Sequence, residues 1–168
     1  MFKIKNNFVS SNLLKQINSL MANVSFPWYF HDQVTTEKDD KKKFYFTHIL
    51  YSLNKINSQF YQDIMPEFIE KLNIKNLLRA KLNLYTQTHK IIEHNYHTDS
   101  SANEPHTTAL FYINDNNGFT IFKKPFKKIK SEKNKCVIFD GSQEHKSTTC
   151  TNKLYRLTLN INYELQKK

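Results

Sequence analysis

Three residues of this chain have the types and the spacing to hold a catalytic metal ion. His97 and Asp99 are separated by a single residue, and His145 follows much later in the sequence. Two imidazoles and one carboxylate are the set that holds ferrous iron on one face and leaves the other face open. A metal ion with open positions is a catalyst more often than a structural element. The sequence therefore predicts a non-haem iron site that can bind reactants.

The elements around the three residues must bring their side chains together. Residues two apart in a strand point to the same side, so His97 and Asp99 can reach one metal ion if their segment is extended. His145 must then come from a neighbouring strand. His94 and His106 flank the motif, and we interpret both as loop or supporting residues, because a fourth protein ligand would close the position that the chemistry needs. In a chain with seven histidines, such a pair alone arises easily by chance.

The chain is strongly basic, with a net charge of +10 that invites a nucleic-acid partner. Only two of its 25 basic residues are arginine, at positions 79 and 156. Proteins that recognise base edges and phosphates use arginine preferentially, so an excess of lysine is weak evidence for specific nucleic-acid recognition. We expect the lysine clusters at 41–43 and 123–130 to lie in loops or hairpin edges.

Length and composition predict one domain over 1–168 with a real core. No apolar run approaches the roughly 18–20 residues of a membrane-spanning helix, and the N-terminus lacks the apolar stretch of a secretory signal. We therefore expect a protein of the cytoplasm, or of the host cytoplasm if a phage encodes it, with no membrane partner. Cys136 and Cys150 are too few for a disulfide framework, and we expect buried, reduced thiols.

Residues 1–75 show helical and aromatic patterns that would support a later core. Apolar residues recur at three- and four-residue spacing over 11–21 and 57–72, which predicts two amphipathic helices. Pro66 should break or kink the second helix or begin a new one. Strand-like aromatic pieces occupy 26–30 and 44–51, and the charged segment 31–43 between them is typical of a mobile loop.

From about Leu77 the pattern changes to alternation of apolar and polar residues, which predicts strands at 78–85, 107–113, 136–139 and 157–163. Asn117-Gly118 is a strong hairpin signal, and Asp140-Gly141 marks a second turn. Helices followed by antiparallel strands predict an α+β, mainly β chain whose residues 76–165 form a sandwich or barrel.

The sequence resembles the 2-oxoglutarate- and iron(II)-dependent dioxygenases, in particular small prolyl-4-hydroxylase-like members of marine bacteria and their phages. The resemblance covers roughly 77–164. The residues that carry it are Tyr85, His97-x-Asp99, the run 108–114, the expected hairpin 117–122, His145 and Arg156-x-Thr158. It implies a double-stranded β-helix, the cupin-like jelly roll, with the N-terminal helices packed on one outer face. The cofactors it implies are Fe(II), 2-oxoglutarate as cosubstrate and O2.

The same resemblance assigns the distal carboxylate of 2-oxoglutarate to Arg156, eleven residues after His145. A planar guanidinium binds a carboxylate by two parallel hydrogen bonds, and alternation places Arg156 on the polar side of its strand. By the resemblance, Tyr112 binds the same carboxylate, Thr158 can donate to it, and Tyr85 lies near the metal-binding end. Ordinary core packing remains the alternative for each tyrosine.

The substrate follows less directly from the sequence. The predicted contacts are Trp28, His31, Asn160, Asn162 and the loop 100–105 beside the metal. The carboxylate of Asp99 favours hydroxylation, or demethylation through hydroxylation, because related halogenases carry a small residue at this position. The resemblance favours a peptide or protein side chain such as proline. A free amino acid or small metabolite is the next alternative, and a nucleic-acid base follows.

Two hypotheses from other functional classes remain open on the sequence alone. A non-catalytic jelly roll that keeps a metal ion would form no succinate from 2-oxoglutarate. A lysine-rich nucleic-acid-binding protein with incidental histidines would keep a salt-sensitive DNA affinity after His97→Ala.

Overall fold

The computed structural model describes residues 2–35, 43–100 and 105–166. It contains two helices and eleven strands in these ranges. They are β1 (Phe2–Lys5), α1 (Ser11–Ala22), β2 (Tyr29–His31), β3 (Tyr45–Ser52), β4 (Lys55–Ile56), α2 (Tyr61–Leu72), β5 (Ile74–Thr86), β6 (Thr107–Tyr112), β7 (Phe119–Phe122), β8 (Lys127–Lys130), β9 (Lys135–Asp140), β10 (His145–Ser147) and β11 (Tyr155–Leu165).

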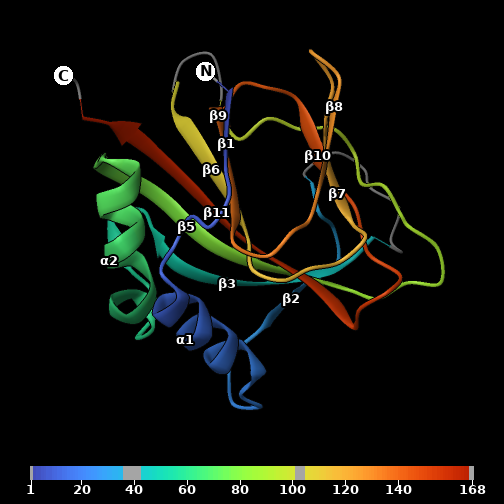
Figure 1. Ribbon diagram of the computed structural model, residues 1–168, viewed down its shortest axis with the longest axis horizontal. Helices are drawn as coiled ribbons and strands as arrows, with labels where there is room; N and C mark the ends of the chain where they lie inside the picture. The colour runs from blue at the N-terminus through green and yellow to red at the C-terminus, as the bar shows by residue number, and fades with distance from the viewer. Residues whose placement is uncertain (1, 36–42, 101–104, 167–168) are drawn as a thin grey trace.

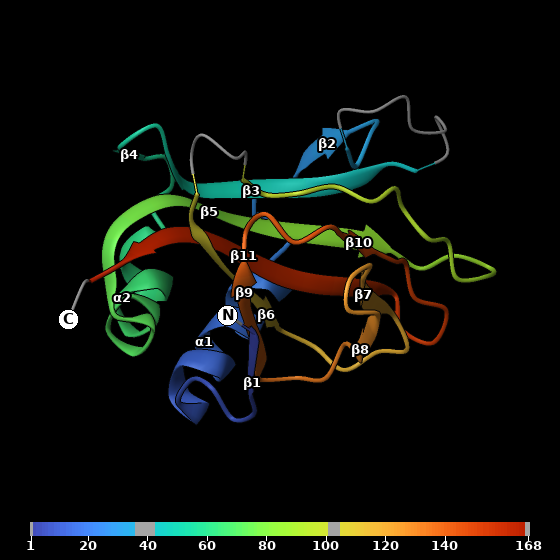
Figure 2. The same cartoon turned by 90° about the horizontal axis from the view of Figure 1, so that it is seen from above.

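The strands form two antiparallel sheets, which confirms the predicted jelly roll. The large sheet has the order β1-β9-β6-β11-β5-β3-β2, with β4 paired to β3, and the small sheet has the order β10-β7-β8. Figures 1 and 2 show the long strands β3, β5 and β11 lying side by side, with the small sheet on one side of them and α1 and α2 on the other. The N-terminal part therefore supplies sheet strands as well as helices.

The alternation of side chains in the large sheet separates two environments. On β6, Ala109 and Phe111 join the core that packs under the helices, while Leu110 and Tyr112 join a second apolar cluster with Phe122 of the small sheet. Successive strand residues point to opposite faces, so one strand serves both environments. Burial of both faces of β6 explains why its residues 109–112 form a continuous apolar run.

Helix α1 follows the sequence prediction closely. The Ser10 hydroxyl caps it by accepting a hydrogen bond from the Leu13 amide at 3.2 Å, and Leu13, Ile17 and Met21 are buried. A serine at this position satisfies one of the amide groups that the first turn leaves free.

The prediction that Pro66 breaks the second helix or begins a new one is wrong. Helix α2 runs through Pro66 from Tyr61 to Leu72 and ends at Asn73, which adopts a left-handed conformation with φ 52°. Proline removes one backbone hydrogen bond from a helix. The turns on either side bury Ile64 and Phe68 against the sheet, and this packing maintains the helix despite the loss.

The prediction of a hairpin at Asn117-Gly118 is also wrong. The preceding strand β6 and the following strand β7 lie in different sheets, so the pair connects two layers. The hairpin of this region joins β7 to β8 through residues 123–126. Gly118 is needed because a Cβ there would lie 2.7 Å from Cδ of Arg156 and 2.8 Å from the backbone oxygen of Thr149. The glycine permits a close approach of backbone and side chain rather than a turn.

Some of the remaining predictions are confirmed, and others concern residues that the structure does not describe. Cys136 and Cys150 are buried and unbridged, as predicted. The lysines of 123–130 lie in the β7–β8 turn and on β8. The predicted loop 31–43 and the segment 100–105 fall partly outside the described residues, at 36–42 and 101–104. Within the described ranges, neither helix has the length and apolar character needed to cross a bilayer.

Candidate functional site

Two neighbouring strands, β5 and β11, form the floor of the site. Leu157, Leu159 and Ile161 of β11 face the helices, so the intervening polar residues face the small sheet. The same alternation on β5 turns Ala80 and Leu82 toward the helices. The polar side chains pair in register across the two strands: Arg79 with Asn162, Lys81 with Asn160, Asn83 with Thr158, and Tyr85 with Arg156.

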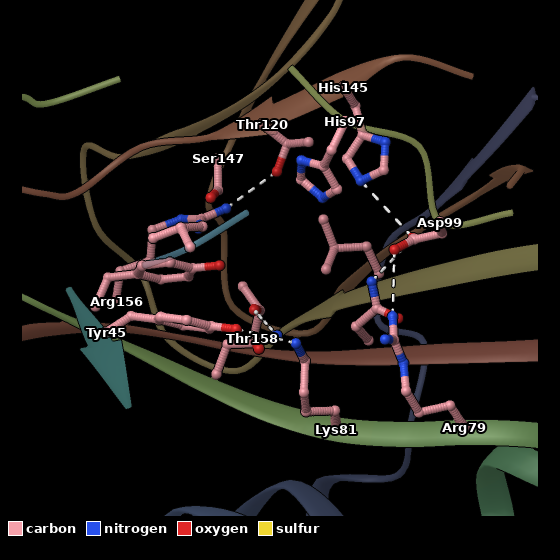
Figure 3. Close-up of a pocket in the computed structure, with 15 residues that line it drawn as sticks. Tyr45, Arg79, Lys81, His97, Asp99, Thr120, His145, Ser147, Arg156 and Thr158 are labelled. Atoms are coloured by element: carbon pink, nitrogen blue, oxygen red, sulfur yellow. Dashed lines mark hydrogen bonds and ion pairs between the residues drawn. The ribbon is translucent and has the colours of Figure 1, made fainter. Parts of the chain in front are cut away.

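The structure brings His97, Asp99 and His145 together at one end of this floor (Figure 3). One potential ligand atom from each lies within 4.8 Å of those of the other two. His97 and His145 exchange both backbone hydrogen bonds at 2.9 Å, so β10 is the neighbouring strand that the sequence required. The segment of His97 is otherwise irregular, and Asp99 is fixed instead by its amide, which donates to the Gly141 carbonyl at 2.9 Å.

Both histidines present the same ring nitrogen to the centre of the site. Nδ1 of His145 lies 2.9 Å from the Gln143 carbonyl, and Nδ1 of His97 lies 3.4 Å from the Asn95 carbonyl. A carbonyl only accepts, so each Nδ1 carries the proton and each Nε2 keeps a lone pair for a metal ion. Burial lowers the pKa of His97 to about 4, aided by the neighbouring His145, so the ring is neutral at physiological pH.

A hydrogen-bonded network holds the carboxylate of Asp99. Its Oδ2 accepts from Thr108 Oγ1 and from Asn160 Nδ2, both at 3.1 Å, and its Oδ1 lies 3.3 Å from Nη2 of Arg79. Asn162 connects the network by donating to Thr108 at 2.9 Å and accepting from Arg79 Nε at 2.9 Å. Burial alone would raise the pKa of Asp99, but His145 and Arg79 lower it to about 2. The ligand is therefore ionised and fixed in orientation.

At the opposite end of the floor lies a buried guanidinium (Figure 3). The Arg156 side chain belongs to a residue only 1% exposed, and its Nη2 donates to Thr120 Oγ1 at 3.0 Å. Its guanidinium carbon lies 5.3 Å from the ring centre of Tyr85 and 5.6 Å from that of Tyr112. Tyr85 therefore lies at the Arg156 end of the floor, and its predicted place near the metal-binding end is wrong, because it pairs in register with Arg156 across β5 and β11. Among the described residues, Nε and Nη1 of Arg156 and the hydroxyl of Tyr112 have no hydrogen-bond partner.

These unpartnered groups fit a dicarboxylate cosubstrate. A buried cation without a counterion is costly unless a ligand supplies the charge. A carboxylate beside Arg156 would pair with the guanidinium and accept from the Tyr112 hydroxyl, whose pKa burial raises to about 12. Thr158 lines the same pocket between Arg156 and the metal-ligand set. The deep pocket thus has an incompletely paired guanidinium at one end and three side chains that could hold a metal ion at the other.

The predicted substrate contacts lie in different places. Trp28 packs against Phe26, with ring centres 5.0 Å apart, in the core under the helices and does not line the deep pocket. His31 lines an outer pocket and bonds Thr47 Oγ1 through Nε2 at 2.8 Å. Asn160 and Asn162 lie beside Asp99 and support that ligand.

The flanking histidines are not part of the metal-ligand set among the described residues. His94 is buried, stacks on Tyr85 with ring centres 5.2 Å apart, and bonds Ser147 Oγ through Nδ1 at 2.7 Å. Burial lowers the pKa of His94 to about 3, with a further contribution from Arg156. The carbonyl of His106 accepts from the Gly141 amide at 2.9 Å and so supports the turn before His145.

Several pocket residues were not predicted from the sequence. Arg79 and Lys81 of β5 and Tyr45 of β3 line both the deep pocket and the outer pocket, which has a volume of about 430 Å³. Lys81 Nζ donates to the Tyr45 hydroxyl at 3.3 Å, and burial lowers the pKa of Lys81 to about 8, together with the charge of Arg79. The sequence feature that could have identified them is the alternation of apolar and polar residues in 78–85. The polar residues of this segment line a pocket and do not face the solvent.

This arrangement of two sheets, with the long strands of the large sheet under an interior site, is the fold of the 2-oxoglutarate- and Fe(II)-dependent oxygenases. The structure is similar to an oxidoreductase of the 2OG-Fe(II) oxygenase family from Burkholderia pseudomallei, with a TM-score of 0.68 and 10% identity over 97% of this chain and 84% of that chain.

Two prolyl hydroxylases share the fold. The viral collagen prolyl hydroxylase from Paramecium Bursaria Chlorella virus-1 has a TM-score of 0.62 and 13% identity, over 98% of this chain and 96% of that chain. A prolyl hydroxylase from Trichoplax adhaerens, solved with a peptide fragment of the hypoxia inducible factor oxygen degradation domain, has a TM-score of 0.68 and 11% identity, over 97% and 83%. No protein-family model and no curated protein sequence matches this chain.

Proposed function

We propose that this protein is a 2-oxoglutarate- and Fe(II)-dependent oxygenase that hydroxylates a C–H bond of its substrate. The observation that carries the proposal is the pairing of two features in one pocket. The His97–Asp99–His145 set lies at one end, and the unpaired guanidinium of Arg156 lies at the other. The fold shared with solved oxygenases supports the same conclusion.

In this mechanism, Nε2 of both histidines and a carboxylate oxygen of Asp99 would hold the metal ion. Fe(II), 2-oxoglutarate and O2 would supply the oxidising chemistry when bound, with 2-oxoglutarate converted to succinate and carbon dioxide. Arg156, Tyr112 and Thr158 hold the distal carboxylate, and Tyr85 packs beneath the guanidinium. Arg79, Asn160 and Thr108 keep Asp99 ionised and oriented.

The substrate class is a finer proposal. The prolyl hydroxylases among the structural neighbours, one of them solved with a peptide, support a peptide or protein side chain such as proline. The outer pocket beside the metal ligands, which includes His31, is the place where a substrate group would enter. A free amino acid or small metabolite is the alternative that fits this volume.

The test begins with anaerobic addition of Fe(II) and 2-oxoglutarate to the purified protein. We expect the weak visible charge-transfer band of the metal chelate, and then succinate formation after oxygen is admitted. The variants Asp99→Ala and His145→Ala should lose both signals. His89→Ala is the matched control, because His89 is exposed and lies outside the ligand set. Persistence of band and succinate in the ligand variants would overturn the assignment.

A further inference from the structure

Two basic side chains stand next to each other where the deep pocket opens into the outer pocket. Arg79 and Lys81 are two residues apart on β5, so their side chains leave the same face of the strand about 7 Å apart. Figure 3 shows both side chains in the deep pocket. Both residues also line the outer pocket, and the two pockets share His97 and Asp99. Neither of them is needed to ligate the metal ion or to hold the distal carboxylate of the cosubstrate.

The ammonium group of Lys81 can donate more hydrogen bonds than it makes within the described residues. Its ammonium group carries three donors, and the Tyr45 hydroxyl at 3.3 Å is its hydrogen-bond partner. No carboxylate of the described residues lies within 4.0 Å of Lys81 Nζ, although the side chain is largely removed from solvent. A partly buried ammonium with no carboxylate in direct contact favours the binding of an anion.

Arg79 also keeps a free edge. Its Nε donates to Asn162 and its Nη2 lies against Asp99, while Nη1 has no hydrogen-bond partner within the described ranges. The Arg79 side chain is 37% exposed, so the free edge can be reached from the outer pocket. A guanidinium held at one edge by the protein is already oriented to bind an anion at the other edge.

The charges of the loaded site leave room for further negative charge. The two negative charges of 2-oxoglutarate offset the two positive charges of Fe(II), and the three cations Arg79, Lys81 and Arg156 then face the single carboxylate of Asp99. Asp99 is the one acidic residue that lines either pocket in the described part of the chain. The net charge of the loaded site is therefore positive, and Arg79 and Lys81 are the two cations that line the outer pocket.

We infer that the substrate carries a carboxylate that binds between Arg79 and Lys81, an inference that rests on the proposed oxygenase function. A phosphate is less suitable, because phosphate sites commonly recruit backbone amides and β5 is paired on both sides, with β3 and β11. A volume of about 430 Å³ suits a small molecule or one residue of a peptide. The carboxylate belongs either to a free amino acid or small acid, or to the terminus or side chain of a peptide.

The experiment compares acids with their neutral counterparts on the enzyme loaded with Fe(II) and 2-oxoglutarate. The arms are the twenty free L-amino acids, their C-terminal amides, and proline-containing tripeptides with either a free or an amidated C-terminus. Succinate above the substrate-free rate and a gain of one oxygen in the product are measured. We expect a carboxylate-bearing compound to stimulate turnover, and its amide to require at least a tenfold higher concentration. The responding arm identifies the source of the carboxylate.

Variants then test the role of Lys81. Lys81→Met should raise the KM of the active acid at least tenfold, with less than a threefold change in the half-saturating concentration of 2-oxoglutarate. Lys75→Met is the matched control on the exposed part of the same strand and should change neither value. Anaerobic calorimetry with Mn(II) and 2-oxoglutarate measures the binding of the acid without turnover and should show the same tenfold loss.

Three results would overturn the inference while the proposed function stands. They are equal stimulation by acids and amides, uncoupled succinate formation that no carboxylate compound stimulates, and a loss in Lys81→Met confined to 2-oxoglutarate binding. Absence of succinate in every arm would overturn the proposed function, and the inference with it.

Discussion

Arg79 and Asp99 form an ion pair across the site, with 3.3 Å between Nη2 and Oδ1. The pair joins the middle of a long strand to a bend in an irregular segment. Asn162 accepts a hydrogen bond from the other side of the guanidinium, so the pairing of β5 with β11 fixes the position of Arg79 beside Asp99. In the proposed metal centre, Arg79 is therefore a positioning residue.

Arg79→Gln should weaken metal binding. Removal of a residue that orients a ligand typically costs 10–100-fold in metal affinity, so we expect about this increase in the Kd for Mn(II). Arg79→Lys should recover part of the loss, because it keeps the charge but lacks the two-sided geometry. A chelator competition titration measures the Kd, and the melting temperature of the metal-free variant checks the fold. An unchanged Kd in Arg79→Gln would show that Arg79 does not position the ligand.

Arg156→Met should have opposite effects on the empty and the loaded protein. Without 2-oxoglutarate, removal of an unpaired buried cation should leave the melting temperature unchanged or raise it. With metal ion and 2-oxoglutarate, the wild type should gain stability by mass action and the variant should not. Loss of a buried charge partner costs ~2–5 kcal/mol, which is a decrease of roughly 30- to 5000-fold in affinity. Thermal denaturation with increasing 2-oxoglutarate makes the comparison, and an equal gain in both proteins would contradict the assignment of Arg156.

Much of the fold could be predicted from the sequence because alternation in strands is a local property. The polar series on β11 and the apolar series between its members follow directly from the order of residues 155–163. The candidate metal ligands stood out by their types and spacing, and the structure brings them together. Arg156 was assigned through the family resemblance, which expects a basic residue eleven residues after His145.

The sequence predictions were incomplete or wrong where tertiary contacts determine the local structure. The support of Asp99 by Arg79 depends on the pairing of β5 with β11, which a single sequence does not specify. The role of Gly118 depends on the close passage of the Arg156 side chain, and local turn chemistry suggested a hairpin instead. Pro66 is tolerated because packing on the sheet outweighs a local preference.

His94 should make stability depend on pH. Burial, reinforced by the charge of Arg156, holds the pKa of His94 near 3, below its ordinary value of 6.5. Between these values the unfolded chain binds a proton that the folded protein excludes, so the free energy of unfolding should rise with pH across this window. His97, with a pKa of about 4, adds to the same trend.

His94→Asn should therefore flatten this dependence. The contribution of one such group is up to about 1.4 kcal/mol per pH unit. Urea denaturation of the metal-free protein at pH 4, 5, 6 and 7 measures the slope in the wild type and the variant. The exposed His89→Asn serves as the comparison and should keep the wild-type slope. A His94→Asn variant with the wild-type slope would show that the folded protein does not exclude the proton from His94.

Gly118→Ala should damage the cosubstrate end of the pocket. The new Cβ would lie 2.7 Å from Cδ of Arg156 and 2.8 Å from the carbonyl oxygen of Thr149, and both must shift to admit it. The backbone of Thr149 is restrained by its amide, which donates to the Ile92 carbonyl at 3.0 Å, so the arginine side chain takes most of the displacement. Overpacking of this kind costs about 1–3 kcal/mol.

We therefore expect Gly118→Ala to lower the melting temperature and to raise the half-saturating concentration of 2-oxoglutarate together, while the Kd for the metal ion changes little. Lys153→Ala in an exposed turn nearby is the control and should alter none of the three values. A variant with reduced stability but normal 2-oxoglutarate binding would show that Thr149 or Asn116, whose Oδ1 would lie 2.9 Å from the new Cβ, yields to the added methyl group and Arg156 does not.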